Sequence, residues 1–463
     1  MIIMKILLLH VPPLYHRFSS SKQTKTKAIT YPPLGLLYIG GVLEKEGHNV
    51  DLIDFMAEEN PKDLLKKTLP SADVVGISVY TKAYKEAAQI AQSIKKMNPN
   101  IPIIIGGPHS TFYPDRALHD IPAADISVEG EGEEVIKDIM KVLNGTKKIS
   151  EISGIQYRKG KKIKAGKPAK IIKDLDPIPL PARHLVDKYE YGTLNNANFY
   201  IQKFTAFLTS RGCPFKCRFC TRHVLSMKNF RVRSAENVIK ELIEVNKNYG
   251  SVMIVDDNFL LDKKRANKIL DGIIENGLNL EIYIQGARVD SADINLYKKM
   301  KKAGVKHLCF GLESGNQDVL NFYNKQITLS QIREAINLSK KMKFFTVGNF
   351  ILGAPIETKK HIEQTIKFAC SLPLDIATFN PLFYQRGSDL WIEAVKNGKL
   401  KKDEVSIADS RKGLGNFTGE ELEKYCEIAV KRFYLRASYI IRLIIKSIIN
   451  RNFTILRVGR NYV

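Results

Sequence analysis

Short apolar runs alternate with longer amphipathic stretches along most of the 463-residue chain, and this alternation is the feature that most constrains its fold. In the first third, the apolar runs lie at 5–9, 49–53, 73–79, 101–105 and 125–128. Nearly continuous Val, Ile and Leu strands joined by helices indicate a parallel sheet covered on both faces. We therefore predict an α/β, Rossmann-like domain over residues 1–150. Ligands of such sheets bind beyond the carboxyl ends of the strands.

The same alternation resumes at about residue 201 and continues to about residue 395. Six candidate strands lie at 203–209, 251–256, 281–285, 307–312, 345–352 and 375–379. Repeated strand–helix units are typical of a TIM-type barrel, whose chemistry lies at the carboxyl ends of its strands. A partial (β/α)6 barrel over 201–395 is our prediction, and a second doubly wound sheet is the alternative.

Two further segments complete the predicted organisation. Residues 151–200 contain a Lys- and Gly-bearing, hairpin-like stretch and a proline-rich run, so we interpret them as a connector. Residues 396–463 form a basic, helical C-terminal region. A helical pattern there puts five isoleucines on one face: Ile440, Ile441, Ile444, Ile445 and Ile448. Packing of this helix on the barrel is the preferred interpretation, and an interfacial helix attracted to anionic lipid headgroups is the alternative.

Composition narrows the class of protein. Hydrophobic residues make up 44% of the chain, which excludes wholesale disorder, and six cysteines in this length exclude a disulfide scaffold. No uncharged apolar run reaches the ~18 residues needed to span a bilayer, so we expect a cytoplasmic protein. The net charge of +24 favours anionic partners. Segment 431–463 carries eight Lys and Arg residues and no acid, which suggests the inner face of a membrane as a peripheral partner. Nucleic acid is a weaker candidate because no recognisable binding module is present.

Three cysteines lie directly after the first strand of the second region, in the stretch Arg211-Gly-Cys213-Pro-Phe-Lys-Cys217-Arg-Phe-Cys220. A structural zinc site wants four ligands, and His223 could supply the fourth. The loop lies at a strand end, and its spacing departs from that of paired zinc knuckles. An iron–sulfur cluster held by three cysteines leaves one iron open to a substrate or cofactor. We therefore prefer a cluster to zinc.

The cysteine motif resembles that of the radical S-adenosylmethionine (SAM) superfamily. This resemblance implies a [4Fe-4S] cluster on Cys213, Cys217 and Cys220, with SAM chelated to the open iron and cleaved to give a 5′-deoxyadenosyl radical. It implies an electron donor such as ferredoxin or flavodoxin. Phe219 matches the family's aromatic position beside the SAM adenine.

Further matches to this family lie at the ends of the later strands. The resemblance implies that Asp257 contacts the SAM amino group and that Arg288 pairs with the SAM carboxylate. Glu313 lies on a strand that resembles the family's sugar-contacting strand, and Gly353 lies in a turn that resembles its Gly-Pro turn.

The N-terminal region resembles the cobalamin-binding domains that are fused ahead of radical SAM barrels. The resemblance rests on Pro32-Pro-Leu-Gly and on the loops around 106–109 and 128–133. It implies cobalamin contacts from residues at the ends of the strands, namely Ser78, Thr81, Gly106, Gly107, His109, Glu129 and Gly130. The D-x-H-x-x-G motif, which supplies a cobalt-binding His in many cobalamin proteins, is absent after the first strand. His109 is expected to pack near the nucleotide tail and not to bind cobalt.

These observations predict a radical SAM enzyme that modifies an unactivated carbon. The preferred reaction is cobalamin-dependent methyl transfer, with a lipid as the preferred substrate. Radical ring closure or another C–C bond formation on a lipid or tetrapyrrole is the alternative. A hypothesis of another class is a non-enzymatic cobalamin- or metal-binding sensor.

Overall fold

The computed structural model describes residues 2–11, 31–194, 197–198, 202–227 and 229–449. The chain divides into two compact units: the first contains the described residues up to 207 together with 224–237, and the second contains 208–223 and the residues from 238 onward. Residues 12–30, which follow the first strand, and residues 450–463 of the predicted basic tail lie outside the described residues.

The first unit is built on a seven-stranded sheet with the order β2-β1-β3-β4-β5-β6-β7. Its first five strands in the chain pair in parallel, and β6 and β7 add an antiparallel hairpin taken from the predicted connector. The strands are β1 (Lys5–Val11), β2 (Asn49–Asp54), β3 (Val74–Val79), β4 (Ile103–Gly106), β5 (Ile126–Val128), β6 (Ile155–Lys159) and β7 (Lys162–Ala165). The order reverses between β1 and β3, where open α/β sheets bind ligands.

Alternate residues of β1 enter two hydrophobic cores, one on each face of this sheet. Leu7 and Leu9 belong to one core, and Ile6 and Leu8 belong to the other. This division follows from the two-residue period of a strand. Helices cover both faces: α1 (Leu34–Lys45), α2 (Pro61–Thr68), α3 (Tyr84–Met97), α4 (Pro108–Phe112), α5 (Ala117–Asp120) and α6 (Glu133–Leu143). The predicted Rossmann-like sheet is confirmed.

A six-stranded sheet with the consecutive order β10-β13-β14-β15-β16-β17 carries the second α/β region. The four neighbouring pairs from β13 to β17 are parallel. The strands are β10 (Phe204–Phe207), β13 (Ser251–Ile254), β14 (Glu281–Ala287), β15 (Val305–Glu313), β16 (Phe345–Leu352) and β17 (Ile376–Pro381). Because the strand order never reverses, the alternative of a doubly wound sheet is wrong, and the partial barrel is confirmed.

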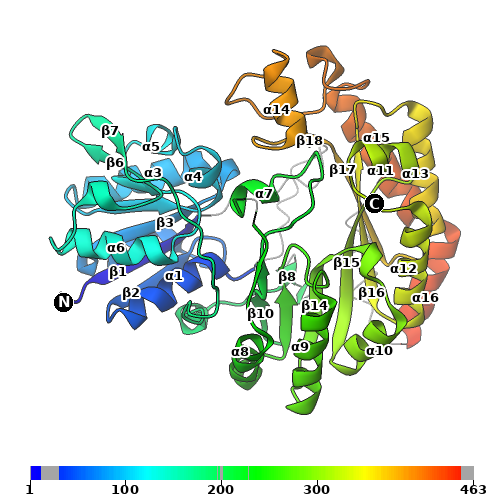
Figure 1. Ribbon diagram of the computed structural model, residues 1–463, viewed down its shortest axis with the longest axis horizontal. Coiled ribbons are helices and arrows are strands. Elements are labelled where there is room, and N and C mark those ends of the chain that lie inside the picture. Colours follow the sequence, from blue (N-terminus) through cyan, green and yellow to red (C-terminus); the bar gives the residue numbers. More distant parts are fainter. Residues whose placement is uncertain (1, 12–30, 195–196, 199–201, 228, 450–463) are drawn as a thin grey trace. The chain divides into compact units, whose positions relative to one another are not determined.

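Helices connect these strands and lie along the outer side of the sheet, as Figure 1 shows for α9, α10, α12 and α13. The connecting helices are α8 (Ala235–Asn248), α9 (Lys263–Glu275), α10 (Ile294–Lys302), α11 (Gln317–Phe322), α12 (Leu329–Lys341) and α13 (Lys359–Ser371). Several begin with side-chain caps, such as the reciprocal Thr328–Gln331 capping box of α12. Every such crossover returns the chain to the same edge, so the loops after the strands gather at their carboxyl ends.

The C-terminal region is helical, as predicted. It contains α15 (Gly419–Tyr434) and α16 (Ala437–Ile449), and α14 (Asp389–Lys396) ends where this region begins. Within the described ranges, no helix is long and apolar enough to cross a membrane.

Candidate active site

The three motif cysteines lie on an irregular segment that follows β10. Cys217 is buried, Cys213 and Cys220 are half-buried, and all three are free thiols. The segment is fixed by backbone bonds: the Cys220 amide donates to the Cys217 carbonyl at 2.9 Å, and the Arg218 amide donates to the Tyr323 carbonyl at 3.0 Å. A loop held by its own backbone keeps the thiols in position before any ligand binds.

A buried carboxylate anchors the start of this segment. Asp256 follows β13, is 2% exposed, and accepts hydrogen bonds from the Thr209 amide at 2.7 Å, the Thr209 hydroxyl at 2.5 Å and the Ser210 hydroxyl at 2.5 Å. Burial raises the pKa of Asp256, and these donors and Arg265 oppose the rise. Asp256 therefore holds the strand end three residues before Cys213.

Positive charge surrounds the cysteine segment. Burial raises the pKa of the Cys217 thiol, while the cations of Lys325 and Arg288 lower it. Arg288 stacks over the ring of Phe215, inside the motif, at 3.6 Å from the ring centroid. Two fixed cations next to thiols favour the thiolate form that an iron cluster requires.

Lys325 is part of a buried ion pair with strained backbone on both sides. Its Nζ lies 2.6 Å from the Glu313 carboxylate. Burial alone would lower the pKa of Lys325, but the Glu313 carboxylate and the Cys217 thiol together outweigh it and the net shift is upward. Glu313, Asn324 and Gln326 all have left-handed φ angles, of 62°, 52° and 57°. Non-glycine residues adopt such angles at a cost in conformational energy, so the surrounding structure must stabilise the backbone around this ion pair.

The aromatic Phe219 lies between the cysteines and this ion pair. Its ring packs edge-on against Tyr323 at 5.0 Å, and Lys325 Nζ lies 5.9 Å from its centroid. The predicted residues Phe219, Arg288 and Glu313 are therefore brought to one end of the second unit, beside Cys217.

Two other predicted SAM contacts lie at strand ends of the same sheet. Asp257 forms an ion pair with Arg222 at 3.2 Å and influences the thiols of Cys213 and Cys220 electrostatically. Gly353 follows β16 with a φ of 108°, and an added Cβ would lie 2.6 Å from a methyl carbon of Leu422. A side chain at this position would therefore strain the backbone and force the Leu422 side chain of α15 to shift.

A buried acid closes the Gly353 turn. Glu357 Oε2 accepts the amides of Gly353 at 2.5 Å and Ala354 at 2.7 Å, and Oε1 has no hydrogen-bond partner among the described residues. Burial raises the pKa of Glu357 to about 7. The turn is thus held by a carboxyl group that titrates near neutrality.

The donor set fits an iron–sulfur cluster better than zinc. Nowhere in the described part of the chain do three or more His, Cys, Asp or Glu side chains gather closely enough to hold a single metal ion. Each cysteine of a three-cysteine cluster binds a different iron, so such thiols stand further apart than the ligands of one ion. His223, the candidate fourth zinc ligand, instead places Nε2 3.0 Å from the Gly387 carbonyl oxygen.

In the first unit, predicted cobalamin contacts meet at the ends of β3 and β4. Gly107 has a φ of 94°, and an added Cβ would lie 3.2 Å from Ser78 Oγ and 3.3 Å from the Val79 nitrogen. Gly106 ends β4, and Thr81 begins the turn after β3. These loops come close only because Gly107 has no side chain. The geometry fits a ligand that lies across the carboxyl ends of the strands.

The loop after β5 joins the same edge. The Gly130 amide donates to Thr111 Oγ1 of α4 at 3.0 Å. Glu129 is half-buried, and this burial raises its pKa. Glu129 and Gly130 therefore lie on a loop that is tied to the helix after β4.

His109 lies on α4, and its side chain is buried in the first unit instead of being exposed at the carboxyl ends of the strands. It is 2% exposed, its Nε2 lies 3.2 Å from Asp120, and its ring stacks on Tyr84 at 5.1 Å. His10, at the end of β1, is likewise buried, with Nδ1 2.9 Å from Asp54. Asp54 in turn accepts a hydrogen bond from the Tyr191 hydroxyl at 2.9 Å.

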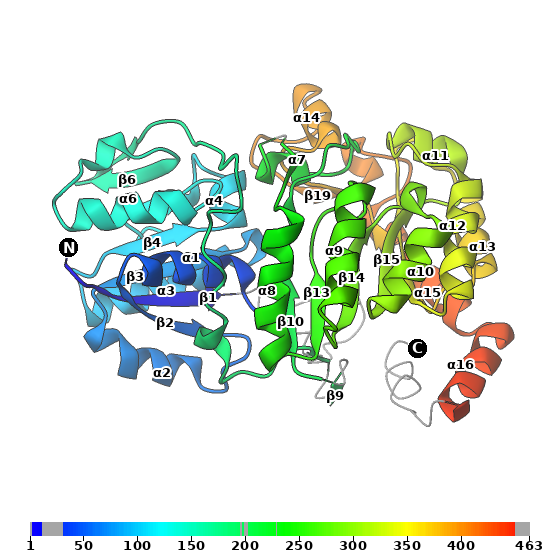
Figure 2. The same cartoon turned by 60° about the horizontal axis from the view of Figure 1, so that its bottom comes forward.

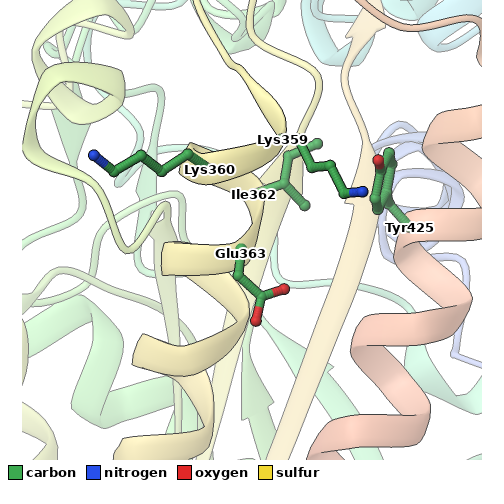
Figure 3. A pocket seen from close by; sticks show the side chains of 5 residues that line it. All are labelled: Lys359, Lys360, Ile362, Glu363 and Tyr425. Atoms are coloured by element: carbon green, nitrogen blue, oxygen red, sulfur yellow. The ribbon is translucent and has the colours of Figure 1, made fainter.

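A separate hollow of about 400 Å³ lies between α13 and α15 (Figure 3). Its lining residues are Lys359, Lys360, Ile362, Glu363 and Tyr425. Lys359 points toward Tyr425, whereas Lys360 points away. None of these is a predicted site residue, so the hollow is not where the cysteine chemistry takes place.

Sequence reasoning missed three buried groups of this site. It selected Asp257 from the acidic pair and overlooked Asp256, although the buried strand before the pair indicated that one acid faces inward. Lys325 and Glu357 belong to no motif that could be recognised in the sequence. Only the folded loops bring Lys325 to the cysteines and the Glu357 carboxylate to the Gly353 amide.

Comparisons with known proteins decide the family. The B12 binding domain model matches residues 26–140, and the Radical SAM superfamily model matches residues 207–369. The chain is 34% identical over 451 residues to a protein named uncharacterized methyltransferase PH0819 of Pyrococcus horikoshii, covering 95% of this chain and 94% of that protein. The chain belongs to the radical SAM enzymes that carry a B12-binding domain.

Relatives and solved structures agree with this assignment. This B12-binding radical SAM enzyme is 25% identical to the hopanoid C-3 methylase of Methylococcus capsulatus, over 90% of this chain and 78% of that protein. Its fold matches the radical SAM methyltransferase TsrM of Kitasatospora setae with a TM-score of 0.70 at 15% identity, covering 93% and 83% of the two chains. It also matches OxsB, a cobalamin-dependent SAM radical enzyme, with a TM-score of 0.66 at 20% identity, covering 79% and 52%.

The family confirms several predictions made from the sequence. The protein is an enzyme, and the alternative of a non-enzymatic sensor is wrong. The predicted [4Fe-4S] cluster, SAM and cobalamin are the cofactors of this family. Radical SAM enzymes commonly need a reductant.

Proposed function

We propose that this enzyme carries out cobalamin-dependent methyl transfer to an unactivated carbon. The observation that carries the proposal is the joining of a B12-binding unit to the three-cysteine segment in one chain, an arrangement shared along almost the full length of the PH0819 methyltransferase. The hopanoid C-3 methylase and the cytidylyl-2-hydroxyethylphosphonate methyltransferase of Streptomyces wedmorensis, 28% identical over 87% of this chain, add support.

The proposed roles of the residues follow from their positions. Cys213, Cys217 and Cys220 would bind the cluster. When bound, the cofactors supply reductive SAM cleavage to a carbon radical and a methyl group for transfer. SAM would be held by Phe219, Asp257, Arg288, Glu313 and Gly353. Cobalamin would be held by Ser78, Thr81, Gly106, Gly107, His109, Glu129 and Gly130, with His109 acting through packing because it is buried.

The surrounding side chains prepare the site in physical terms. Arg288 keeps a guanidinium beside the cysteines, where Asp290 orients it by accepting from Nε and Nη2, the latter at 2.9 Å; a SAM carboxylate would bind there by the remaining Nη1 or by displacing Asp290. The Lys325–Glu313 pair adds a second fixed cation at low solvent exposure, where electrostatic interactions are stronger than in water. Asp256 fixes the start of the cysteine segment, and Glu357 fixes the Gly353 turn.

A lipid is the substrate class we propose. The hopanoid methylase relative supports an apolar substrate, and so do the exposed isoleucines of α16.

Ring closure is the second candidate. It is supported by the anaerobic magnesium-protoporphyrin IX monomethyl ester cyclase of Cereibacter sphaeroides, which is 27% identical over 77% of this chain. This chain covers only 60% of that cyclase, which makes methyl transfer the better supported reaction.

For the cellular setting, we propose a cytoplasmic enzyme with ferredoxin or flavodoxin as its reductant. Segment 431–463 would bring it to the inner face of the membrane, and nucleic acid is not a proposed partner.

The test uses anaerobically reconstituted enzyme, reductant and SAM labelled in its methyl group, with a lipid extract as substrate. Methyl transfer predicts label in a lipid product together with 5′-deoxyadenosine and S-adenosylhomocysteine. Formation of 5′-deoxyadenosine with an unlabelled product would overturn methyl transfer and favour ring closure. The Cys217→Ala variant is the control and should form neither labelled lipid nor 5′-deoxyadenosine.

A further inference from the structure

Helix α16 has two chemically different faces, and one of them holds it on the rest of the second unit. The Tyr439 hydroxyl donates to the Asp375 carbonyl oxygen at 2.7 Å. Arg436 donates to the Cys370 carbonyl oxygen, and Arg442 donates to the Leu374 carbonyl oxygen. Tyr439 also packs against Phe433 of α15, with ring centroids 5.4 Å apart. These contacts fix the rotation of α16 about its own axis.

The other face of α16 is an exposed apolar stripe, which we call the isoleucine stripe. Ile441 is 57% exposed, Ile445 is 51% exposed and Ile448 is 60% exposed. The stripe consists of Ile440, Ile441, Ile444, Ile445 and Ile448. At 100° per residue these five positions cover about 140° of the helix surface, opposite Tyr439 and Arg442. The packing interpretation is therefore correct for the tyrosine and arginine face and wrong for the isoleucines.

So many exposed isoleucines on one helix require a partner. Single exposed apolar residues are ordinary, but contiguous apolar patches mark interaction sites. Leu435, just before α16, is a further exposed apolar residue, with 51% of its surface accessible. Figure 2 shows α16 at the margin of the second unit, where a large flat surface could approach it.

We infer that the isoleucine stripe inserts into the surface of an anionic lipid bilayer, with α16 lying in the plane of the membrane. The inference deepens the proposed peripheral location of the enzyme and is independent of the methyl-transfer chemistry. The stripe would be buried among the upper acyl chains, while Tyr439 and Arg442 keep the helix attached to the barrel.

Charge decides between a membrane and a second copy of the chain. Segment 431–463 contains eight basic residues and no acidic residue, within a chain of net charge +24. Two copies that met stripe to stripe would bring these like charges together, which is unfavourable. Anionic headgroups complement the same charges and attract juxtamembrane basic segments. Lys431 is exposed at the start of this segment, on α15.

The experiment measures sedimentation of the purified full-length chain with vesicles. One set of vesicles is phosphatidylglycerol mixed equally with phosphatidylcholine, and the other is phosphatidylcholine alone. We expect the chain to bind the anionic vesicles at least tenfold more tightly. Ile441→Ser/Ile445→Ser should weaken this binding at least tenfold, because two exposed apolar groups of the stripe are lost. The matched control is Ile392→Ser, at an isoleucine of α14 that is 49% exposed, and it should bind as the parent does.

Each outcome has a clear meaning. Equal binding by the stripe variant and the parent would overturn the inference, and so would equal binding to both kinds of vesicle. A concentration-dependent dimer in light scattering that Ile441→Ser/Ile445→Ser abolishes, without vesicle binding by the parent, would assign the stripe to a second copy instead. Because turnover is not measured, failure here leaves the proposed methyl transfer untouched. Circular dichroism of the variant shows whether it is folded.

Discussion

Removing the buried carboxylate of Asp256 should destabilise the second unit and prevent loading of the cluster. Asp256 accepts three hydrogen bonds from Thr209 and Ser210, and its carboxylate lies 3.9 Å from the Arg265 guanidinium. In Asp256→Ala, the donors and the largely buried Arg265 lose this partner. Breaking a buried charged network of this kind costs about 3 to 5 kcal/mol.

Asp256→Asn should cost less, about 1 to 3 kcal/mol, because an amide retains one acceptor oxygen but cannot accept at its nitrogen. The neighbouring Asp257→Asn is the matched control. Its partner Arg222 is 61% exposed in its side chain, and an exposed pair of this kind contributes roughly 0 to 1 kcal/mol.

Thermal unfolding of the apoprotein measures these differences. For a unit of this size each kcal/mol lowers the Tm by roughly 2 to 4 °C, so Asp256→Ala should unfold at least about 4 °C below Asp257→Asn. Iron content after anaerobic reconstitution should fall in Asp256→Ala, because Cys213 is no longer positioned. If Asp256→Ala has the same Tm as Asp257→Asn and binds the same amount of iron, Asp256 does not anchor the cysteine segment.

Three further predictions concern other buried groups. Because burial raises the pKa of Glu357 from 4.5 to about 7, the folded chain holds this proton more tightly than the unfolded chain, and the contribution of Glu357 to stability should fall by roughly 3 kcal/mol as the pH rises from about 4.5 to 7. Glu357→Gln should remove that fall. If the free energy of urea unfolding changes with pH by the same amount in variant and parent across this range, the prediction is wrong. His307 lies buried on β15 and makes the opposite contribution. Because burial lowers its pKa from 6.5 to about 4, the contribution of His307 to stability should be lost as the pH falls from 6.5 toward 4, and His307→Leu should abolish this contribution in the same assay. Lys325→Met should lower the free energy of unfolding by about 3 to 5 kcal/mol, because it leaves the Glu313 carboxylate buried without its cation. The double variant Lys325→Met/Glu313→Gln should recover most of this stability. If the losses of the two single variants simply add in the double variant, the pair is not coupled.

Local periodicity and motif spacing were sufficient to predict much of the fold. All six strands of the partial barrel were predicted from apolar runs, because a buried parallel strand needs a continuous apolar sequence. The alternative of a doubly wound sheet could be excluded only by strand order, which no local pattern encodes. The hairpin of β6 and β7 joins the first sheet through pairing with β5, a contact between strands separated in the sequence by α6.

The candidate site was predictable where covalent spacing determines it. Three cysteines within eight residues share a segment in any fold, so their chemistry could be read directly. Lys325 lies more than a hundred residues further along the chain, and only the folded loop after α11 brings its charge to Cys217. The direction of the isoleucine stripe was likewise undetermined, because a sequence shows that a helix is amphipathic but not which face a neighbour covers. Tyr439 and Arg442 decide it in the folded protein.

The central claim is that one chain holds an iron–sulfur cluster on Cys213, Cys217 and Cys220 and cobalamin in its first unit. The most direct test is iron, sulfide, zinc and cobalt analysis of anaerobically purified protein supplied with cobalamin, for the parent and for Cys217→Ala. We expect about four irons with matching sulfide and one cobalt per parent chain. In Cys217→Ala the iron and sulfide should be lost and the cobalt retained. Zinc without sulfide in the parent, or unchanged iron in the variant, would contradict it.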